Sequence, residues 1–376
     1  MGIFAQDGEA CVKVIASKKN WIESSAIEQL QNTAELPGIR MAVGLPDLHP
    51  GKDCPIGAAF ISAKWIYPQL IGNDIGCGMG LWQTDLKVQN LSLDNWIKKL
   101  GALDAPWSED VTTWLNHYNL ESSVFDRSLG TIGGGNHFAE LQAIESIEDY
   151  AAFTALGLDK KNFYLLVHSG SRGLGAHVFA NYLEAYNHRG LHQDTTEAIA
   201  YLATHDKAAA WAKANRALIA HRFLVCLHSQ SKLILDINHN TVTMQEIDGK
   251  RYWLHRKGVI PATAGVVIIP GSRGSLSYLV QPIGLQTTNA YSLAHGAGRK
   301  WKRTDAKSKL AKYSITDFAK TALGGRVICT DKNLMYEEAP QAYKNIEIVI
   351  KDMVDAGLIS VIATLRPVIT YKTRRH

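Results

Sequence analysis

The sequence predicts an α+β fold in one continuous domain, residues 1–376. Its expected strands come in hairpin-like groups rather than in regular β-α-β alternation, which favours mixed or antiparallel sheets flanked by helices. No internal repeat, low-complexity tract or linker rich in proline, serine or charge interrupts the chain. The hydrophobic fraction of 46% and the charged fraction of 20% are those of an ordinary globular protein.

Periodicity identifies the elements expected in the first half of the chain. Trp21–Leu36 has apolar residues at helical spacing and stops before a Pro-Gly pair. Asn162–Val167 is a short apolar run that predicts a strand, and His168 follows at its carboxyl end. Gly175–Tyr186 and the alanine-rich His205–His228 predict helices.

The second half contains further strands and one helix. Lys232–Asn238 alternates apolar and polar residues, so His239 is expected at or just past a strand end. Thr241–His255 predicts a hairpin that turns at Asp248-Gly249. The remaining expected elements are a strand over Val259–Ile269, a helix over Ile346–Ala356, and strands at Ile359–Ile362 and Pro367–Tyr371.

Cysteine usage and hydropathy predict a cytoplasmic protein with no membrane partner. The five cysteines are odd in number, scattered and never form a Cys-x-x-Cys pair, which argues against a disulfide framework or a zinc knuckle. No apolar run is long enough to cross a bilayer. The segment Met1–Asn20 lacks the apolar core of a signal peptide.

Basic residues gather at two places, although the net charge is only +5. The run from Arg299 to Lys312 holds seven basic residues and one acid, Asp305. A charge run is usually a solvated helix face, but this run starts directly after His295-Gly-Ala-Gly, so we favour a phosphate-binding edge of a site. The second cluster comprises Arg366, Lys372, Arg374 and Arg375.

Five residues with metal-binding side chains lie beside glycine or asparagine. Asp74 and Cys77 are three apart with Gly76 between them, so both side chains can turn toward one point. A carboxylate with a thiolate suits a borderline divalent ion such as Mn, Zn or Co. The alternative is that Cys77 is a buried apolar filler, as most free cysteines are. The three histidines in such loops are His137, His168 and His239.

These donors are too many for one four-coordinate ion with an open position, but they suit two ions bridged by the thiolate. Two neighbouring ions are a common arrangement for phosphoryl transfer. A lone histidine is more often a surface or satisfied core residue. We assign that interpretation to His117, His177, His188, His192, His205, His221, His228 and His376.

His295 differs in kind from these ligands. The small residues after it expose backbone N–H groups, and Arg299 opens the basic run, so a phosphate is expected beside this imidazole. It could be a sixth metal ligand. We favour a nucleophile, because a neutral imidazole that attacks phosphorus forms a phosphoramidate that can pass the group on.

These segments resemble the RtcB family of RNA ligases over nearly the whole chain. The motifs that carry the resemblance, in order, are Pro46-Asp47-Leu-His49, Pro55-Ile-Gly57, Asp74-Ile-Gly-Cys-Gly-Met79, Gly133-Gly-Gly-Asn-His-Phe138, His168-Ser-Gly-Ser-Arg-Gly173, His255-Arg-Lys-Gly258, Pro270-Gly-Ser272 with Ser277-Tyr278, and His295-Gly-Ala-Gly-Arg299. The chain is short for the family, which predicts a divergent bacterial branch.

The resemblance implies an RtcB-like single domain around a central site with two Mn²⁺ ions. Cys77 would bridge the ions, with Asp74 and His137 on one and His168 and His239 on the other. His295 would become covalently guanylylated by GTP, and Asp47 would be a further active-site acid. The positions matching the GTP pocket are Asn136, Glu140, Asn240, Ser272, Ser277, Ala297, Gly298, Tyr343 and Lys372.

The implied activity joins an RNA 3′-phosphate or 2′,3′-cyclic phosphate end to a 5′-hydroxyl end, in RNA repair or tRNA splicing. Arg172, Arg299 and Arg303 are our candidates for contacts with RNA phosphates. Two alternatives remain open at the level of sequence. One is a metal-dependent phosphohydrolase or cyclic phosphodiesterase on RNA ends; the other is a non-catalytic RNA-binding protein with a structural metal.

Three departures from the usual family pattern affect the RNA face and the nucleotide pocket more than the metal ligands. Pro50-Gly-Lys-Asp-Cys54 stands where an aromatic-glycine segment is usual. Lys302 stands before Arg303 where serine is commoner. The tail Thr373–His376 continues past the lysine that usually lies beside the C-terminus.

Overall fold

The structure is a computed structural model that describes residues 10–374. Residues 1–9 of the N-terminal segment tested for a leader, and the basic residue Arg375 with His376, lie outside the described residues. None of the helices formed by residues 10–374 combines the length and apolarity that a membrane crossing requires.

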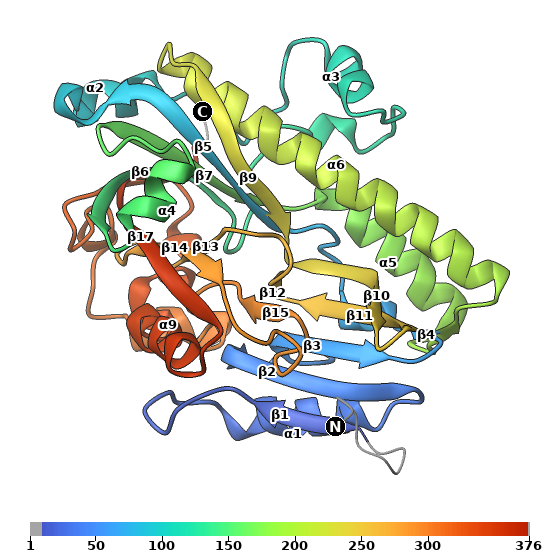
Figure 1. Cartoon of the computed structure of the whole chain (residues 1–376). Helices are drawn as coiled ribbons and strands as arrows, with labels where there is room; N and C mark the ends of the chain where they lie inside the picture. The colour runs from blue at the N-terminus through green and yellow to red at the C-terminus, as the bar shows by residue number, and fades with distance from the viewer. Residues whose placement is uncertain (1–9, 375–376) are drawn as a thin grey trace.

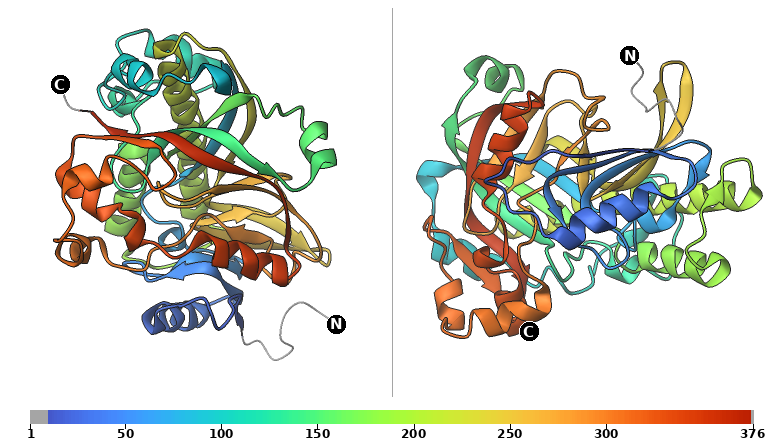
Figure 2. Two further views of the ribbon diagram at one scale, coloured as in Figure 1. Left: turned by 90° about the vertical axis from the view of Figure 1, so that its left-hand side faces the viewer. Right: turned by 90° about the horizontal axis from the view of Figure 1, so that it is seen from below.

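A five-stranded mixed sheet lies at the base of the molecule as seen in Figure 1. Its order is β1-β2-β3-β11-β10; β1 runs parallel to β2, and the other pairs are antiparallel. Helix α1 lies across its outer face, as the view from below in Figure 2 shows. It packs there through Ala26 and Leu30. The bounds are β1 Cys11–Val14, α1 Ser24–Ala34, β2 Ile39–His49, β3 Ile56–Ser62, β10 Asn240–Ile247 and β11 Lys250–Lys257.

The larger, eight-stranded sheet carries the strands that build the site. Its order is β13-β14-β17-β6-β7-β5-β9, and β16 pairs in parallel with the last part of β17. All other neighbouring pairs in this sheet are antiparallel. The bounds are β5 Gly78–Lys87, β6 Phe138–Ile147, β7 Asn162–Ser169, β9 Ser231–Asn238, β13 Val267–Pro270, β14 Ser277–Pro282, β16 Arg326–Cys329 and β17 Ile359–Thr373.

Helices cover the faces of the large sheet. Helix α6 packs on one face, where Phe223 meets Leu165 and Val167, and α5 lies alongside α6 (Figure 1). Alternate residues of the same strands point to the other face, where Leu166 meets Phe153 of α4. The helices are α2 Leu93–Lys99, α3 Val111–His117, α4 Tyr150–Ala155, α5 Arg172–Tyr186, α6 Thr196–Cys226, α7 Arg303–Lys309, α8 Lys332–Glu337 and α9 Ile346–Asp355.

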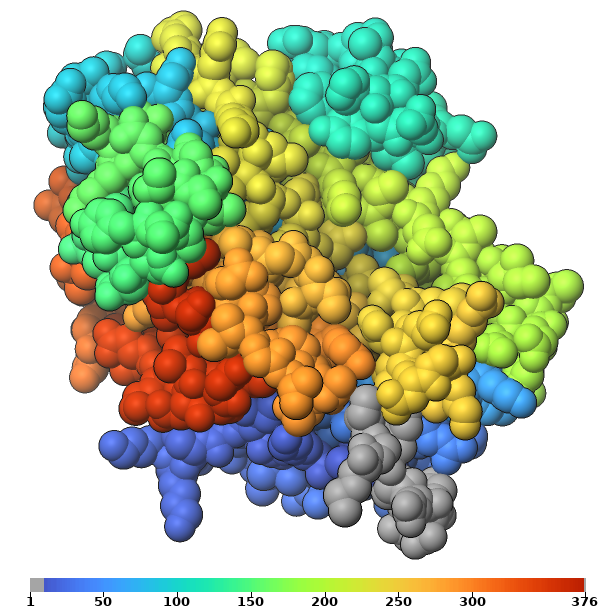
Figure 3. All heavy atoms as spheres, viewed as in Figure 1, coloured from blue at the N-terminus to red at the C-terminus, as the bar shows by residue number. Residues whose placement is uncertain are grey.

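One hydrophobic cluster joins the two sheets. It contains Val43 and Ile61 of the small sheet, Val280 and Ile359 of the large sheet, and Val349 of α9. The space-filling view in Figure 3 shows the N-terminal, central and C-terminal segments packed against one another on this face. Organisation as one domain remains a prediction, and this shared core is the observation that supports it. Two small two-stranded sheets pair β4 Trp65–Ile66 with β8 Leu191–His192, and β12 Val259–Pro261 with β15 Ser292–Ala294.

The predicted α+β class with mixed and antiparallel sheets is confirmed, and the hairpin turns at Asp248-Gly249 as expected. Three details were wrong. The strand predicted over Val259–Ile269 is two strands in different sheets, because Gly265 has a φ of +79° and turns the chain between them. The last two predicted strands are the single strand β17, which accommodates Pro367 at a register shift. Helix α6 starts nine residues before the predicted start, where the Thr195 side chain accepts a hydrogen bond from the Ala198 amide.

Candidate active site

Four adjacent antiparallel strands bring four of the predicted ligands to one edge of the large sheet. His137 immediately precedes β6, His168 lies at the end of β7, Cys77 immediately precedes β5, and His239 immediately follows β9. Because neighbouring strands alternate in direction, the start of one lies beside the end of the next. The backbone also fixes the fourth ligand, since the His239 amide donates to the Cys77 carbonyl at 2.7 Å.

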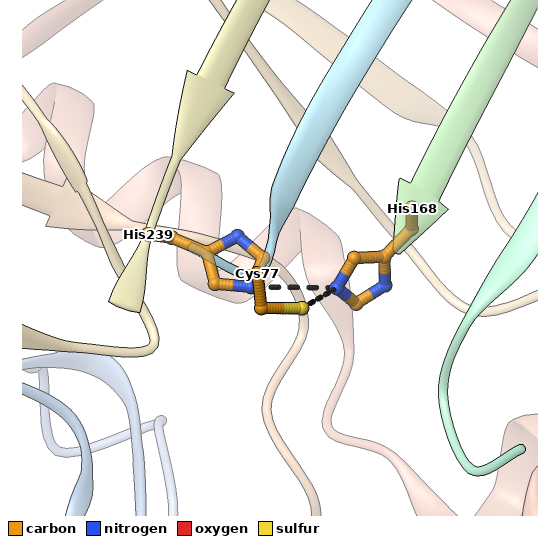
Figure 4. Close-up of side chains that lie close together, drawn as sticks. All are labelled: Cys77, His168 and His239. Carbon is orange, nitrogen blue, oxygen red and sulfur yellow. Dashed lines mark hydrogen bonds between the residues drawn. The ribbon is translucent and has the colours of Figure 1, made fainter. Parts of the chain in front are cut away.

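The ligand atoms lie within van der Waals reach of one another. The Cys77 Sγ is 3.2 Å from Nε2 of His168 and 3.3 Å from Nε2 of His137. The Nε2 atoms of His168 and His239 are 3.3 Å apart (Figure 4). Nε2 of His137 is 2.9 Å from Oδ2 of Asp74. Two donor groups result, one of Asp74, Cys77 and His137 and one of Cys77, His168 and His239, so Cys77 belongs to both.

Hydrogen bonds to the far nitrogens orient two of the imidazoles. Nδ1 of His137 lies 3.1 Å from the Ile132 carbonyl, and Nδ1 of His168 lies 3.2 Å from the Asn136 carbonyl. A carbonyl only accepts, so each Nδ1 carries the proton and each Nε2 presents its lone pair to the cluster.

Electrostatics at the cluster match what a cation requires. Burial, together with the other histidines of the site, holds the pKa values of His168 and His239 well below the usual range, so both imidazoles are neutral. Burial and the Asp74 carboxylate raise the pKa of the Cys77 thiol. Lone pairs that face one another in a dry site repel unless a cation lies between them, and a bound divalent ion displaces the thiol proton. The donor set therefore suits divalent cations.

A buried arginine that sequence reasoning missed ties three ligand segments together. Arg216, on α6, donates to the carbonyls of Gly76 and Ser169 at 2.8 and 2.9 Å and to the side chain of Asn238 at 2.6 Å. Each of these three residues is the chain neighbour of a ligand. The guanidinium is fully buried and paired with Asp236.

His295 lies beside the cluster and is held by an acid. Its ring centroid is 4.8 Å from that of His239. Oδ2 of Asp47 lies 2.7 Å from Nδ1 of His295 and also accepts from its backbone N–H at 3.1 Å. The buried carboxylate thereby fixes the proton on Nδ1 and leaves Nε2 as the free lone pair.

One cavity of about 900 Å³ contains most of the predicted site. Two predicted residues lie behind its wall: Asp47 behind His295, and Ser277, which is buried and accepts from Gln142. Asn240 lines the cavity, but its amide already donates to the Asp74 carbonyl and accepts from Gly258. The predicted residues on the wall are Asp74, Cys77, Asn136, His137, Glu140, His168, His239, Asn240, Ser272, His295, Ala297, Gly298, Tyr343 and Lys372.

Buried charged groups also line the cavity. Burial raises the pKa of Glu140 to about 7 and lowers the pKa of Lys372 to about 8. The Lys372 Nζ donates to the Gly135 carbonyl at 2.7 Å. Glu338, which sequence reasoning did not single out, is buried between Arg299 and the Tyr343 hydroxyl. No spacing or motif distinguished Glu338 from an ordinary helix-end acid.

The three arginines predicted to contact RNA differ in availability. Arg299 pairs with Glu338 at 3.2 Å and its guanidinium lies over the Tyr343 ring, so it is already engaged. Arg172 lines the cavity with its Nε lacking a partner among the described residues, and its φ of +54° is unusual for a non-glycine residue. Arg303 also lines the cavity and is half-exposed, and its Nε lies 3.7 Å from Oε1 of Glu338. Arg303 therefore shares Glu338 with Arg299, while the Nε of Arg172 has no partner among the described residues.

Comparison with known proteins gives the relatives of this chain. The family model described as "tRNA-splicing ligase RtcB" matches residues 29–121 and 112–373. The chain belongs to the RtcB family. It is 49% identical to an RNA-splicing ligase RtcB2 of Escherichia coli, over 99% of this chain and 98% of that protein. It is 31% identical to the tRNA-splicing ligase RtcB of Nanoarchaeum equitans, over 96% of this chain and 95% of that protein.

A protein of this length therefore has a near full-length counterpart among bacterial RtcB proteins. A second RNA-splicing ligase RtcB, also from Escherichia coli, is 29% identical over 93% of this chain and 95% of that protein. The resemblance stated from the motifs is confirmed. The cluster around Cys77 is thus the candidate metal centre of an RtcB-family member.

Proposed function

We propose that this chain seals broken or cleaved RNA by joining a 3′-phosphate or 2′,3′-cyclic phosphate end to a 5′-hydroxyl end, with GTP as cosubstrate and two Mn²⁺ ions. The observation that carries the proposal is His295, fixed by Asp47 and placed beside two donor groups that share Cys77. RNA ligase activity itself follows from membership of the RtcB family, whose matching relatives are named as RNA- and tRNA-splicing ligases.

The residues present suit two manganese ions. Asp74, Cys77 and His137 would hold one, and Cys77, His168 and His239 the other, with the thiolate between them. When bound, the ions neutralise negative charge that develops on phosphate oxygens. A carboxylate, neutral imidazoles and one thiolate form a mixed donor set that Mg²⁺ or Ca²⁺ would not favour.

The first chemical step is guanylylation of His295. Its Nε2 attacks the α-phosphorus of GTP, an N–P bond forms, and the bond from that phosphorus to the β-phosphate oxygen breaks to release pyrophosphate. Asp47 keeps the proton on Nδ1 and stabilises the positive charge that develops on the ring. Backbone N–H groups of the Gly-Ala-Gly segment that follows His295 would receive the phosphate oxygens.

The later steps consume the RNA ends. Water opens a 2′,3′-cyclic end to a 3′-phosphate, and an oxygen of that phosphate displaces His295 from GMP. The 5′-hydroxyl then attacks the activated 3′-phosphorus, which forms the phosphodiester and releases GMP. Arg172 and Arg303, both on the cavity wall, would hold RNA phosphates.

The nucleotide would occupy the side of the cavity lined by Glu140, Tyr343 and Lys372. A buried carboxylate can accept from the guanine N1 and amino groups, and a buried tyrosine offers a flat ring face. We place the other proposed contacts at Asn136, Asn240, Ser272, Ala297 and Gly298, with Ser277 acting from behind the wall through Gln142.

Labelling with GTP that is radioactive at the α-phosphate tests the covalent step. We expect label on the purified protein in an acid-labile, base-stable bond, and no label on His295→Ala. Unlabelled wild type, or a labelled His295→Ala, would overturn the proposal. Product formation from RNA ends that persists without GTP would indicate a phosphohydrolase instead.

All five cysteines are free, in keeping with our proposal of a cytoplasmic setting.

A further inference from the structure

A second cavity of about 430 Å³ adjoins the active site. Four of its lining residues, Glu23, Lys300, Trp301 and Lys302, also line the main cavity, so the two cavities are neighbours. The other three are Trp21, Asp305 and Lys309. Nothing in the chemistry proposed above uses this second cavity.

Two indoles face this space, and one of them is unusually exposed. Trp21, just before α1, is 55% exposed and is the only exposed tryptophan among residues 10–374. Trp301 lies two residues before α7 and is half-buried. A large flat side chain left in solvent at the mouth of a site is a mark of an interaction surface rather than of core packing.

The backbone and one edge of Trp301 are firmly held. Its ring packs against the buried cluster of Leu310, Phe318, Met335 and Ala339. Its amide donates to the Ala342 carbonyl at 3.3 Å, and its carbonyl accepts from Arg299 Nε at 3.1 Å. The indole is therefore presented on a rigid support, which lowers the entropy lost when a ligand stacks on it.

The charge around the indoles is positive. Lys300 and Lys309 place their ammonium groups 5.1 and 5.0 Å from the Trp301 ring centroid. Lys302 is a third cation that lines this cavity, and the two acids that line it are Glu23 and Asp305. Asp305 lies 4.0 Å from Lys309, so Lys300 and Lys302 are the cations left for a ligand. Lysines around an aromatic platform match a ligand that has a flat base and a phosphate.

We propose that Trp21 and Trp301, with Lys300 and Lys302, form a stacking subsite for an unpaired nucleobase of the RNA, next to the end being joined. The proposal rests on the ligase function proposed above. A base that stacks on Trp301 replaces a lysine on the ring, and the released ammonium pairs with the adjoining phosphate. Neither indole makes a base-specific hydrogen bond in this arrangement, so the subsite is expected to accept any base.

Fluorescence anisotropy with a short single-stranded RNA bearing a 3′-phosphate, in the absence of GTP, tests the subsite. Trp21→Ala changes an exposed side chain, and Trp301→Leu keeps an apolar side chain against the core but removes the flat ring. We expect each variant to bind about tenfold or more weakly, the loss typical of one stacked base. In ligation assays the RNA KM should rise while kcat stays near wild type.

Two controls make the result specific. Tyr150→Ala removes another exposed aromatic side chain, on α4, that lines neither cavity, and should leave RNA affinity unchanged. An RNA with abasic sites at its terminal nucleotides has no base to stack. Its affinity for wild type should therefore equal its affinity for Trp301→Leu. Wild-type affinity in both tryptophan variants, or equal weakening in Tyr150→Ala, overturns the subsite.

The labelling of His295 by GTP separates this proposal from the proposed function. We expect Trp21→Ala and Trp301→Leu to label like wild type, because neither residue lies among the predicted GTP contacts. If wild type is labelled by GTP but both tryptophan variants bind RNA as tightly as wild type, the stacking subsite alone is refuted. Absence of labelling in wild type would refute the ligase chemistry, whatever the anisotropy shows.

Discussion

Oδ2 of Asp47 lies 2.7 Å from Nδ1 of His295 and 3.1 Å from the backbone nitrogen of the same residue. One carboxylate oxygen thus fixes both the position of the residue and the tautomer of its ring. The remaining nitrogen, Nε2, is free to act as a nucleophile. Asp47 is itself fully buried on β2, and the ammonium group of Lys344 lies near enough to interact with its charge.

Removing the acceptor should therefore disable guanylylation. We expect Asp47→Ala to lower the rate of GTP labelling by a factor on the order of 10⁴, the scale at which loss of an orienting carboxylate acts on a catalytic histidine. Asp47→Asn keeps the shape but loses the charge and can turn its NH₂ group toward Nδ1, which favours the wrong tautomer, so a loss of similar size is expected. Single-turnover labelling measures both. Labelling of Asp47→Ala at the wild-type rate would show that the contact has no catalytic role.

Arg216 provides a second test, on the architecture of the metal centre. Arg216→Met leaves the partly buried Asp236 without its partner and removes the contacts to Gly76, Ser169 and Asn238. Breaking such a pair typically costs about 3–5 kcal/mol of unfolding free energy. We expect a loss of this size in urea unfolding, and weaker Mn²⁺ binding by calorimetry.

A double variant separates stability from metal positioning. Arg216→Met with Asp236→Leu replaces the ion pair by apolar side chains, which often restores stability. The ligand-flanking carbonyls of Gly76 and Ser169 still lack their donor, so Mn²⁺ affinity should remain low, by about 10-fold or more. Recovery of metal affinity together with stability would show that Arg216 acts only on folding.

Much of the site could be predicted because its ligands occupy loops with distinctive composition. Cys77, His137 and His239 lie among Gly and Asn at strand ends, and the alternating strand directions of the large sheet then bring them together. Arg216 could not be found in this way. It lies in the middle of the 31-residue helix α6, and its contacts reach residues 140 and 47 positions away in sequence.

The strands that were predicted wrongly have the same physical cause as the failure to identify Arg216: both depend on contacts between distant parts of the chain. Apolar periodicity reports burial, but it does not report which sheet a strand joins. Val259–Pro261 and Val267–Pro270 are both apolar, yet one pairs with β15 and the other with β14. Pro367 likewise resembles a strand break locally, and only the pairing of β17 with β6 across a register shift keeps the strand continuous.

The third prediction concerns the glycines that precede His137 and the position of Arg172 beside them. Gly133 has a φ of +94°, and a Cβ there would lie 1.9 Å from Nη1 of Arg172. Gly133→Ala should therefore displace the arginine from the cavity and weaken RNA binding, and should also cost about 1–2 kcal/mol in backbone strain. Gly134→Ala is the matched control, since no atom lies within 4 Å of its Cβ position. Equal RNA affinities for the two variants, measured by anisotropy, would contradict this role of Arg172.

The pH dependence of GTP binding follows from two buried groups on the proposed nucleotide side. Burial raises the pKa of Glu140 to about 7, so its carboxylate, the form that accepts from guanine, is lost as the pH falls through about 7. Burial lowers the pKa of Lys372 to about 8, so its ammonium is lost as the pH rises through about 8. Affinity should therefore be greatest between these two values and fall on both sides.

Calorimetric titration of GTP into the metal-free His295→Ala variant from pH 6 to 9 measures this profile without turnover. Bound GTP stabilises the charged form of each group. The affinity should therefore start to fall slightly below the pKa of Glu140 in the free protein and slightly above that of Lys372. Glu140→Gln removes the ionisable acid and should flatten the limb below pH 7 while it lowers affinity at neutral pH. Lys372→Met should likewise remove the alkaline limb. A flat affinity profile in wild type, or an acid limb that survives in Glu140→Gln, would show that Glu140 does not bind the nucleotide. The guanine contact would then be sought at Glu338, the other buried acid that lines the cavity.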